Sequence, residues 1–149
     1  MPVKPIPDGY NAVIPYLMVP DAVRFIEFLS TVFGARVTEQ LMRPDGKIGH
    51  TEVRLRDSMI MLSEASDGYP ATPVMLHFYV EDVDATFKRA VQAGGTVVAE
   101  PSNQFYGDRS GGVKEPSGNT IWIATHVEDV PSDELQKRAA AAMQQREQK

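Results

Sequence analysis

The stretch YLMVPDAVRFIEFLSTVFGARV, Tyr16 to Val37, decides the fold, because a second stretch of the chain has the same plan. That second stretch is FYVEDVDATFKRAVQAGGTVV, Phe78 to Val98, and it aligns with the first at an offset of 61 residues. The alignment pairs Val19 with Val80, Asp21 with Asp82, Ile26 with Phe87, Gly34 with Gly95, and Val37 with Val98. A repeat of this kind indicates that the chain holds two copies of one structural unit.

Each copy reads as a strand, an acidic turn, an amphipathic helix and a glycine stop. Apolar residues recur at three- and four-residue steps in both predicted helices, as one buried helical face requires. These residues are Ala22, Phe25, Ile26, Leu29 and Phe33 in the first copy, and Val83, Phe87, Ala90 and Val91 in the second. Asp21 suits the N-cap of the first helix and Gly34 its left-handed end, whereas Gly94 and Gly95 end the second helix.

Three strand-like runs follow each helix. In the first copy they are residues 36–42, 47–56 and 58–64, with a tight connection at Asp57-Ser58, and in the second they are residues 96–100, 110–114 and 120–125. The sequence therefore predicts an α+β fold of two tandem βαβββ modules that form curved mixed sheets, about residues 10–66 and 74–127, with a linker at 67–73. We expect a C-terminal helix at about 131–147 with Ser132 as its N-cap, and its thin apolar stripe is typical of a marginal surface helix.

Composition narrows the class of protein. The 149 residues suit a single domain, and 42% hydrophobic content is ordinary for a globular chain. The absence of cysteine excludes disulfides, thiolate zinc sites and cysteine nucleophiles. A net charge of -5 disfavours a nucleic-acid partner, and no apolar run is long enough for a membrane helix, so we expect a cytoplasmic protein.

Two motifs in the second copy resemble one known family. The segment FYGDRSGGVKEPSGNTIWIATH, Phe105 to His126, has a Gly-Asp-Arg turn, an acidic-Pro-x-Gly-Asn hairpin and a final strand with a tryptophan. The segment LHFYVEDVDATFKRAVQAGG, Leu76 to Gly95, precedes it at the matching distance. Together with the repeat, these motifs resemble the glyoxalase/bleomycin resistance/dihydroxybiphenyl dioxygenase family, also called the vicinal oxygen chelate superfamily, in its PhnB-like branch.

The resemblance implies paired modules that enclose a cup-like pocket, and relatives that pair as homodimers. Metal-dependent relatives hold a divalent ion with four ligands, usually His or Glu. By register, those positions are Ile14, Met61, Met75 and Trp122 in this sequence. None of these side chains is a ligand for a hard divalent cation, so we predict no metal and no other cofactor. A divalent metal at a displaced site stays the alternative.

Several residues are candidates for chemistry. His77 and Glu64 form one hypothetical displaced site, and the alternative for His77 is a buried histidine with a structural hydrogen bond across the sheet. Asp108 and Arg109 lie among glycines, where the arginine either binds an anion or forms a structural ion pair. His50 and His126 are expected at the surface or at strand ends. The predicted ligand pocket comprises Ile14, Tyr16, Met61, Met75, His77, Phe105, Tyr106, Arg109 and Trp122, although the aromatic residues could equally be core.

Three functions fit this sequence. The first is metal-free binding of a small organic molecule, as in bleomycin resistance proteins. The second is a family enzyme, a lyase, isomerase or dioxygenase, which would use a displaced metal or acid–base site near His77. The third is a structural or partner-binding module whose pocket is vestigial.

Overall fold

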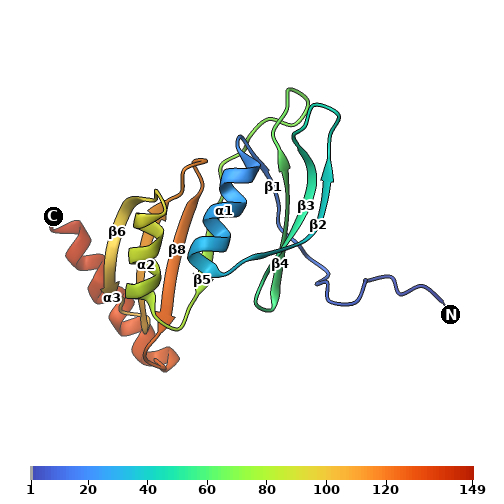
Figure 1. Ribbon diagram of the computed structural model, residues 1–149. Coiled ribbons are helices and arrows are strands. Elements are labelled where there is room, and N and C mark those ends of the chain that lie inside the picture. Colours follow the sequence, from blue (N-terminus) through green and yellow to red (C-terminus); the bar gives the residue numbers. More distant parts are fainter. Residues whose placement is uncertain (1) are drawn as a thin grey trace. The chain divides into compact units, whose positions relative to one another are not determined.

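The computed structural model describes residues 2–149, which form two compact units (Figure 1). Unit 1 comprises residues 2–74 together with Glu115–Asn119, and unit 2 comprises Met75–Lys114 and Thr120–Lys149. Each unit carries one four-stranded sheet and one helix packed on it, in the order βαβββ. The predicted α+β fold of two tandem βαβββ modules is therefore confirmed.

Unit 1 contains β1 (Tyr16–Val19), α1 (Ala22–Phe33), β2 (Arg36–Met42), β3 (Ile48–Leu55) and β4 (Ser58–Glu64). Its sheet has the order β1-β4-β3-β2, with β1 parallel to β4 and the other pairs antiparallel. The strand pairing sets Leu55 opposite Ser58, so the tight turn consists of Arg56 and Asp57. The predicted turn at Asp57-Ser58 is thus wrong by one residue, and Arg56 takes the positive φ of 53° that such short turns require.

Helix α1 forms where the apolar spacing predicts it. The Asp21 carboxylate accepts a hydrogen bond from Arg24 N at 3.1 Å, which caps the first turn. Gly34 ends the helix with a φ of 68°, a conformation that costs glycine little. The helix packs against β3 and β4 and buries Phe25, Leu29 and Val32.

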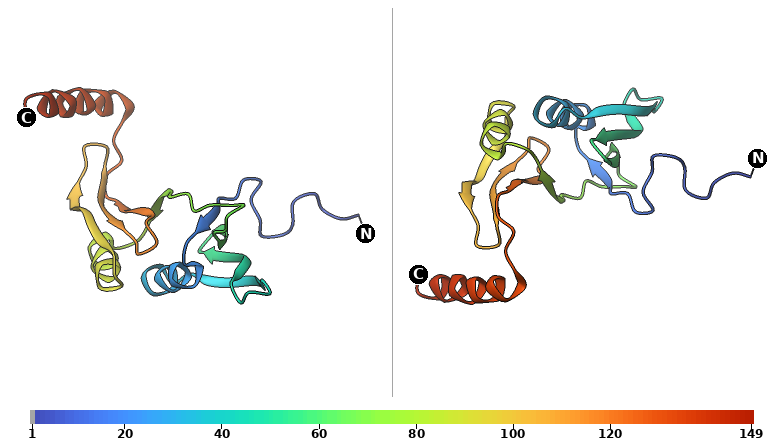
Figure 2. Two further views of the ribbon diagram at one scale, coloured as in Figure 1. Left: turned by 90° about the horizontal axis from the view of Figure 1, so that it is seen from above. Right: turned by 90° about the horizontal axis from the view of Figure 1, so that it is seen from below.

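Burial alternates along the strands of unit 1, so its sheet has two different faces. The helix-covered face carries the buried side chains of Leu17, Val19, Val53 and Leu62. The other face, called here the open face of sheet 1, carries Tyr16, Met18, Glu52 and Met61. The N-terminal segment runs along this second side, away from α1 (Figure 2).

Unit 2 contains β5 (Met75–Tyr79), α2 (Val83–Gln92), β6 (Thr96–Asn103), β7 (Asp108–Lys114), β8 (Thr120–His126) and α3 (Ser132–Glu147). Its sheet repeats the first in the order β5-β8-β7-β6, with β5 parallel to β8. Strands β6 and β7 are longer than predicted, and β6 continues past Pro101, which lies at a register shift where a residue without an N–H is tolerated.

The acidic-Pro-x-Gly-Asn motif forms the hairpin between β7 and β8. The buried carboxylate of Glu115 accepts hydrogen bonds from Ser117 N, Asn119 N and Asn119 Nδ2 at 2.6, 2.9 and 2.8 Å. The amide oxygen of Asn119 accepts from Val74 N at 3.0 Å. The motif therefore has a structural role: its acidic side chain replaces water for three backbone and side-chain donors.

Helix α3 buries none of its side chains, as its thin apolar stripe predicts. Pro131 occupies the N-cap position and Ser132 is the first helical residue, so the prediction of Ser132 as N-cap is wrong. Within unit 2, α2 and α3 lie on opposite sides of the sheet (Figure 2). Among residues 2–149, no helix has the length and apolarity needed to cross a membrane.

Two glycines with nearly equal φ angles test how closely the chain approaches Gly107. Gly107 has a φ of 99°, and a Cβ there would lie 2.1 Å from Glu128 O, whereas Gly118 has a φ of 101° and open space around it. We expect Gly118→Ala to lower the free energy of unfolding by the conformational cost alone, about 1 to 2 kcal/mol. Gly107→Ala should cost clearly more, because the segment after β8 must also move. Urea denaturation of both variants measures the difference, and equal losses would contradict the close approach.

Candidate functional site

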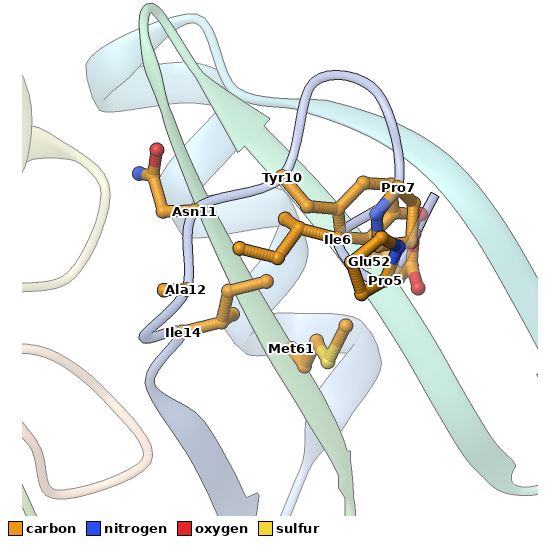
Figure 3. Close-up of a pocket in the computed structure, with 9 residues that line it drawn as sticks. All are labelled: Pro5, Ile6, Pro7, Tyr10, Asn11, Ala12, Ile14, Glu52 and Met61. Carbon is orange, nitrogen blue, oxygen red and sulfur yellow. Dashed lines mark hydrogen bonds between the residues drawn. The ribbon is translucent and has the colours of Figure 1, made fainter. Parts of the chain in front are cut away.

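The open face of sheet 1 carries a cavity of about 440 Å³ (Figure 3). The N-terminal segment forms one wall, β3 and β4 form the other, and the lining residues are Pro5, Ile6, Pro7, Tyr10, Asn11, Ala12, Ile14, Glu52 and Met61. Most of these side chains are apolar. Two of the predicted pocket residues, Ile14 and Met61, therefore lie together in one cavity.

Glu52 is the charged residue of this cavity. It is only 8% exposed, and its Oε2 accepts a hydrogen bond from the Tyr10 hydroxyl. Its Oε1 lies 3.4 Å from His50 Nε2, and the other nitrogen of that ring, Nδ1, lies 2.9 Å from the Tyr16 hydroxyl. The hydrogen bond to the Glu52 carboxylate raises the pKa of Tyr10 above its usual range, so Tyr10 remains a neutral donor.

Two contacts hold the N-terminal segment against the sheet. One is the hydrogen bond from Tyr10 to Glu52, and the other runs from Arg54 Nη2 to Gly9 O at 2.5 Å. Both Glu52 and Arg54 belong to β3 and lie on the same face, because they are two residues apart. The cavity wall therefore depends on two polar side chains of a single strand.

The four positions that hold metal in relatives do not fit a hard cation in this chain. Strand pairing places Tyr16 beside Met61 in sheet 1 and His77 beside Trp122 in sheet 2. At the four positions named from the resemblance, Ile14, Met61, Met75 and Trp122, no side chain is an ordinary ligand for a hard divalent ion, whereas His77, beside Trp122, carries one that is. In residues 2–149, no three His, Asp or Glu side chains gather closely enough to hold a metal.

His77 lies exposed on β5, and Glu64 lies beside the start of α1. His77 is exposed, and its ring meets the edge of Tyr79 at a centroid distance of 5.0 Å, so the alternative of a buried structural histidine is wrong. Glu64 accepts a hydrogen bond from Ala22 N at 2.8 Å. Its carboxylate thus stabilises the start of α1, where the helix dipole favours negative charge.

Asp108 and Arg109 are neighbours on β7 and therefore point to opposite faces of sheet 2. Arg109 forms a two-pronged ion pair with Asp84 of α2, with both N···O distances at 2.8 Å. This pair lowers the pKa of Asp84 and raises that of Arg109. Of the two alternatives for Arg109, the structure has the ion pair, which ties α2 to the sheet.

Asp108 lies on the face of sheet 2 opposite α2 and is 3% exposed. Its Oδ2 accepts a hydrogen bond from the Tyr79 hydroxyl at 2.7 Å, and its Oδ1 lies 2.8 Å from His126 Nδ1. The other nitrogen of that histidine, Nε2, lies 2.8 Å from Asp129 Oδ1. The carboxylate thus joins a phenol and an imidazole in one chain of hydrogen bonds, an arrangement that can hold or pass a proton.

The remaining candidates are aromatic or apolar side chains of unit 2. Met75 is 68% exposed on β5, and the half-buried Trp122 ring lies over Gly112. Phe105 and Tyr106 meet edge to face at 5.3 Å in the loop before β7. The aromatic residues of the predicted pocket do not belong to the fully buried core, because each is at least partly exposed.

Several polar residues of the site are not predicted from the sequence. Tyr10 precedes the predicted first strand, and Glu52 carries no motif. Tyr79 and Asp129 look like ordinary strand and turn residues, and His126 does lie at a strand end as expected. The one usable signal is spacing: Tyr16, His50 and Glu52 fall on the same side of their strands once the register of β1, β4 and β3 is known.

Comparison with known proteins gives three findings. The model of the Glyoxalase/Bleomycin resistance protein/Dioxygenase superfamily matches residues 10–123. An uncharacterized protein of Mycobacterium bovis is 35% identical over 136 residues, which cover 84% of this chain and 90% of that protein.

Solved structures resemble the fold. TioX from Micromonospora sp. ML1 has a TM-score of 0.63 at 22% identity and covers 81% of this chain and all of its own. The PhnB protein from Bacillus cereus has a TM-score of 0.61 at 13% identity and covers 77% of this chain and 99% of its own.

The hydrogen bonds of His126 predict a pH dependence. Asp108 and Asp129 both raise the pKa of His126, because they stabilise its protonated form. The stability that this histidine contributes is therefore fully present below the unfolded pKa of about 6.5 and is lost as pH rises through the higher folded pKa. NMR titration of the His126 ring should give a midpoint above about 6.5. The free energy of unfolding should fall less steeply above that pH in His126→Gln than in the wild type.

The exposed His77, which makes neither of these contacts, provides the control. The variant His77→Gln should keep the pH dependence of the wild type. A His126 midpoint at or below the ordinary value would contradict the two carboxylate contacts.

Proposed function

Since the chain belongs to the glyoxalase/bleomycin resistance protein/dioxygenase superfamily, we propose that it binds a small organic molecule in the cavity of unit 1, without a metal of the family type. The observation that carries the proposal is the cavity itself. Its volume of about 440 Å³ lies within the range of ligand pockets, roughly 300 to 1,000 Å³, and exceeds what a vestigial, filled pocket would leave.

The lining supports binding of an organic molecule. Ligand pockets are mostly apolar with a few placed polar groups, and this cavity combines aliphatic side chains and prolines with the carboxylate of Glu52. Ile14 and Met61 offer apolar contact at two of the positions that relatives use for metal ligands. Binding without metal is therefore the function that this set of side chains favours.

A screen of small molecules by thermal unfolding tests the proposal. A ligand at about 100 times its Kd stabilises the folded chain by about 2.7 kcal/mol, enough to raise Tm by about 5 to 10 °C. We expect Met61→Trp to abolish this rise, because the larger ring fills the cavity. The same change at the exposed Met75 should leave it intact. The proposal fails if no compound raises Tm, or if Met61→Trp responds as the wild type does.

An acid–base enzyme is the second candidate function, and the network of Tyr79, Asp108 and His126 favours it. Its carboxylate is buried and hydrogen-bonded on both oxygens, while the phenol and the imidazole are exposed to solvent. The bond to Asp108 raises the pKa of Tyr79, so the phenol keeps its proton at neutral pH. A substrate on this face would meet two groups able to donate or accept a proton.

Turnover measurements on isomerase and lyase substrates distinguish this candidate from simple binding. If the network is catalytic, Tyr79→Phe should lower kcat by about a hundredfold or more, since general acid–base groups contribute at least that much. Tyr69→Phe, at an exposed tyrosine outside the network, should leave kcat unchanged. Unaltered turnover in Tyr79→Phe would exclude a catalytic role for its hydroxyl.

The homodimer, the cytoplasmic location and the absence of cofactors stay predictions. They rest on the resemblance and on composition, and of the three only the absence of a metal enters the proposal for unit 1.

A further inference from the structure

Glu52 is a buried carboxylate whose charge has no fixed counter-ion. Its two partners are Tyr10, which donates a neutral phenol hydrogen bond, and His50, whose ring nitrogen lies at 3.4 Å. Neither side chain carries a permanent positive charge. Within residues 2–149 the ion pair of Glu52 is with that histidine, and no lysine or arginine pairs with it. A buried charge of this kind is stabilised when a cation approaches it.

Among the described residues, the nearest arginine of β3 forms no ion pair with Glu52. Arg54, two residues further along β3, donates a hydrogen bond at 2.5 Å to Gly9 O in the N-terminal segment. Glu39 on β2 stands directly opposite Glu52 in the strand pairing, so the next charge across the sheet has the same sign. A ligand that carries a carboxylate or phosphate would be repelled at this place.

The rest of the cavity lining favours a ligand whose main part is apolar. Around Glu52, Figure 3 shows the rings of Pro5, Pro7 and Tyr10, and further along the cavity the aliphatic chains of Ile6 and Ile14 from the N-terminal segment and of Met61 from β4. An aromatic ring beside a carboxylate is also a favourable environment for an ammonium group, because the ring face attracts cations.

We propose that the cavity of unit 1 binds an organic cation with an apolar body, whose amine or guanidinium group pairs with Glu52. This inference rests on the proposed function, because it names the class of ligand for the same cavity. The charged group lies against the Glu52 carboxylate, and the apolar body lies along Ile14 and Met61.

Three probes that share one body and differ in the head group test the inference: phenylbutylamine, phenylbutanol and phenylbutyrate. The measurement is the change in backbone amide NMR shifts of unit 1 on titration into the full chain at about pH 8. At that pH free histidine is mostly neutral and an alkylamine is charged. We expect the amine to bind about tenfold or more tightly than the alcohol, and the acid to bind most weakly.

Variants then test whether Glu52 causes the preference for the amine. Glu52→Gln should lower the affinity for the amine by about tenfold and leave the affinity for the alcohol unchanged, so that the two probes bind with similar affinity. Glu52→Asp keeps the charge and should retain the preference for the amine. The matched control is Glu27→Gln, which removes the same charge from the exposed face of α1 and should change neither affinity.

The possible results distinguish the ligand class inferred here from the proposed function of the cavity. Binding of the alcohol or the acid as tightly as the amine overturns the inference and leaves the cavity as a small-molecule site. A preference for the amine that survives in Glu52→Gln overturns the role of Glu52. If none of the probes shifts the amides of the cavity lining at millimolar concentration, the inference fails, while the proposed function is decided by the thermal screen. The ranking in the wild-type chain decides the ligand class even where Glu52→Gln does not fold.

Discussion

One-sided burial of each sheet is the constraint on which the rest of the structure depends. In each unit a single amphipathic helix covers one face, and strand alternation sends every second side chain to that face. In unit 1 this places Leu17, Val19 and Leu62 in the core and leaves Tyr16 and Met61 on the other side. A shift of one residue in the pairing would exchange the two sets, so the same register that builds the core also builds the cavity.

A similar polar cluster lies on the open face of sheet 1 and on the face of sheet 2 opposite α2. In unit 1 the buried carboxylate of Glu52 meets a tyrosine and a histidine, and in unit 2 the buried carboxylate of Asp108 does the same. Each binds a terminal part of the chain to its sheet. Tyr10 belongs to the N-terminal segment, whereas His126 also contacts Asp129, just before the C-terminal helix. Only the first of these carboxylates lines the cavity described in unit 1, and for this reason the two proposals assign them different roles.

Membership of the family shows the fold of this chain, whereas its function depends on the residues of the site. The pocket residues predicted from the resemblance illustrate the difference. Ile14 and Met61 line one cavity, while Arg109 lies on the helix-covered side of its sheet in an ion pair with Asp84. Glu64 stabilises a helix start, and the hairpin with the Gly-Asn motif is organised around the Glu115 carboxylate. Residues that stand out in the sequence thus divide between scaffold and site, and only their contacts tell which is which.

The sequence by itself determined the duplication, the two capped helices and the α+β class. These features are local, because they follow from spacing, propensity and residue type within one segment. Only the tertiary structure decided the partners of the buried carboxylates. Tyr10 and Glu52 are 42 positions apart, and Tyr79 and Asp108 are 29 apart. Strand order, register and the path of a terminal segment bring such groups together, and none of these is written in the spacing of the residues themselves.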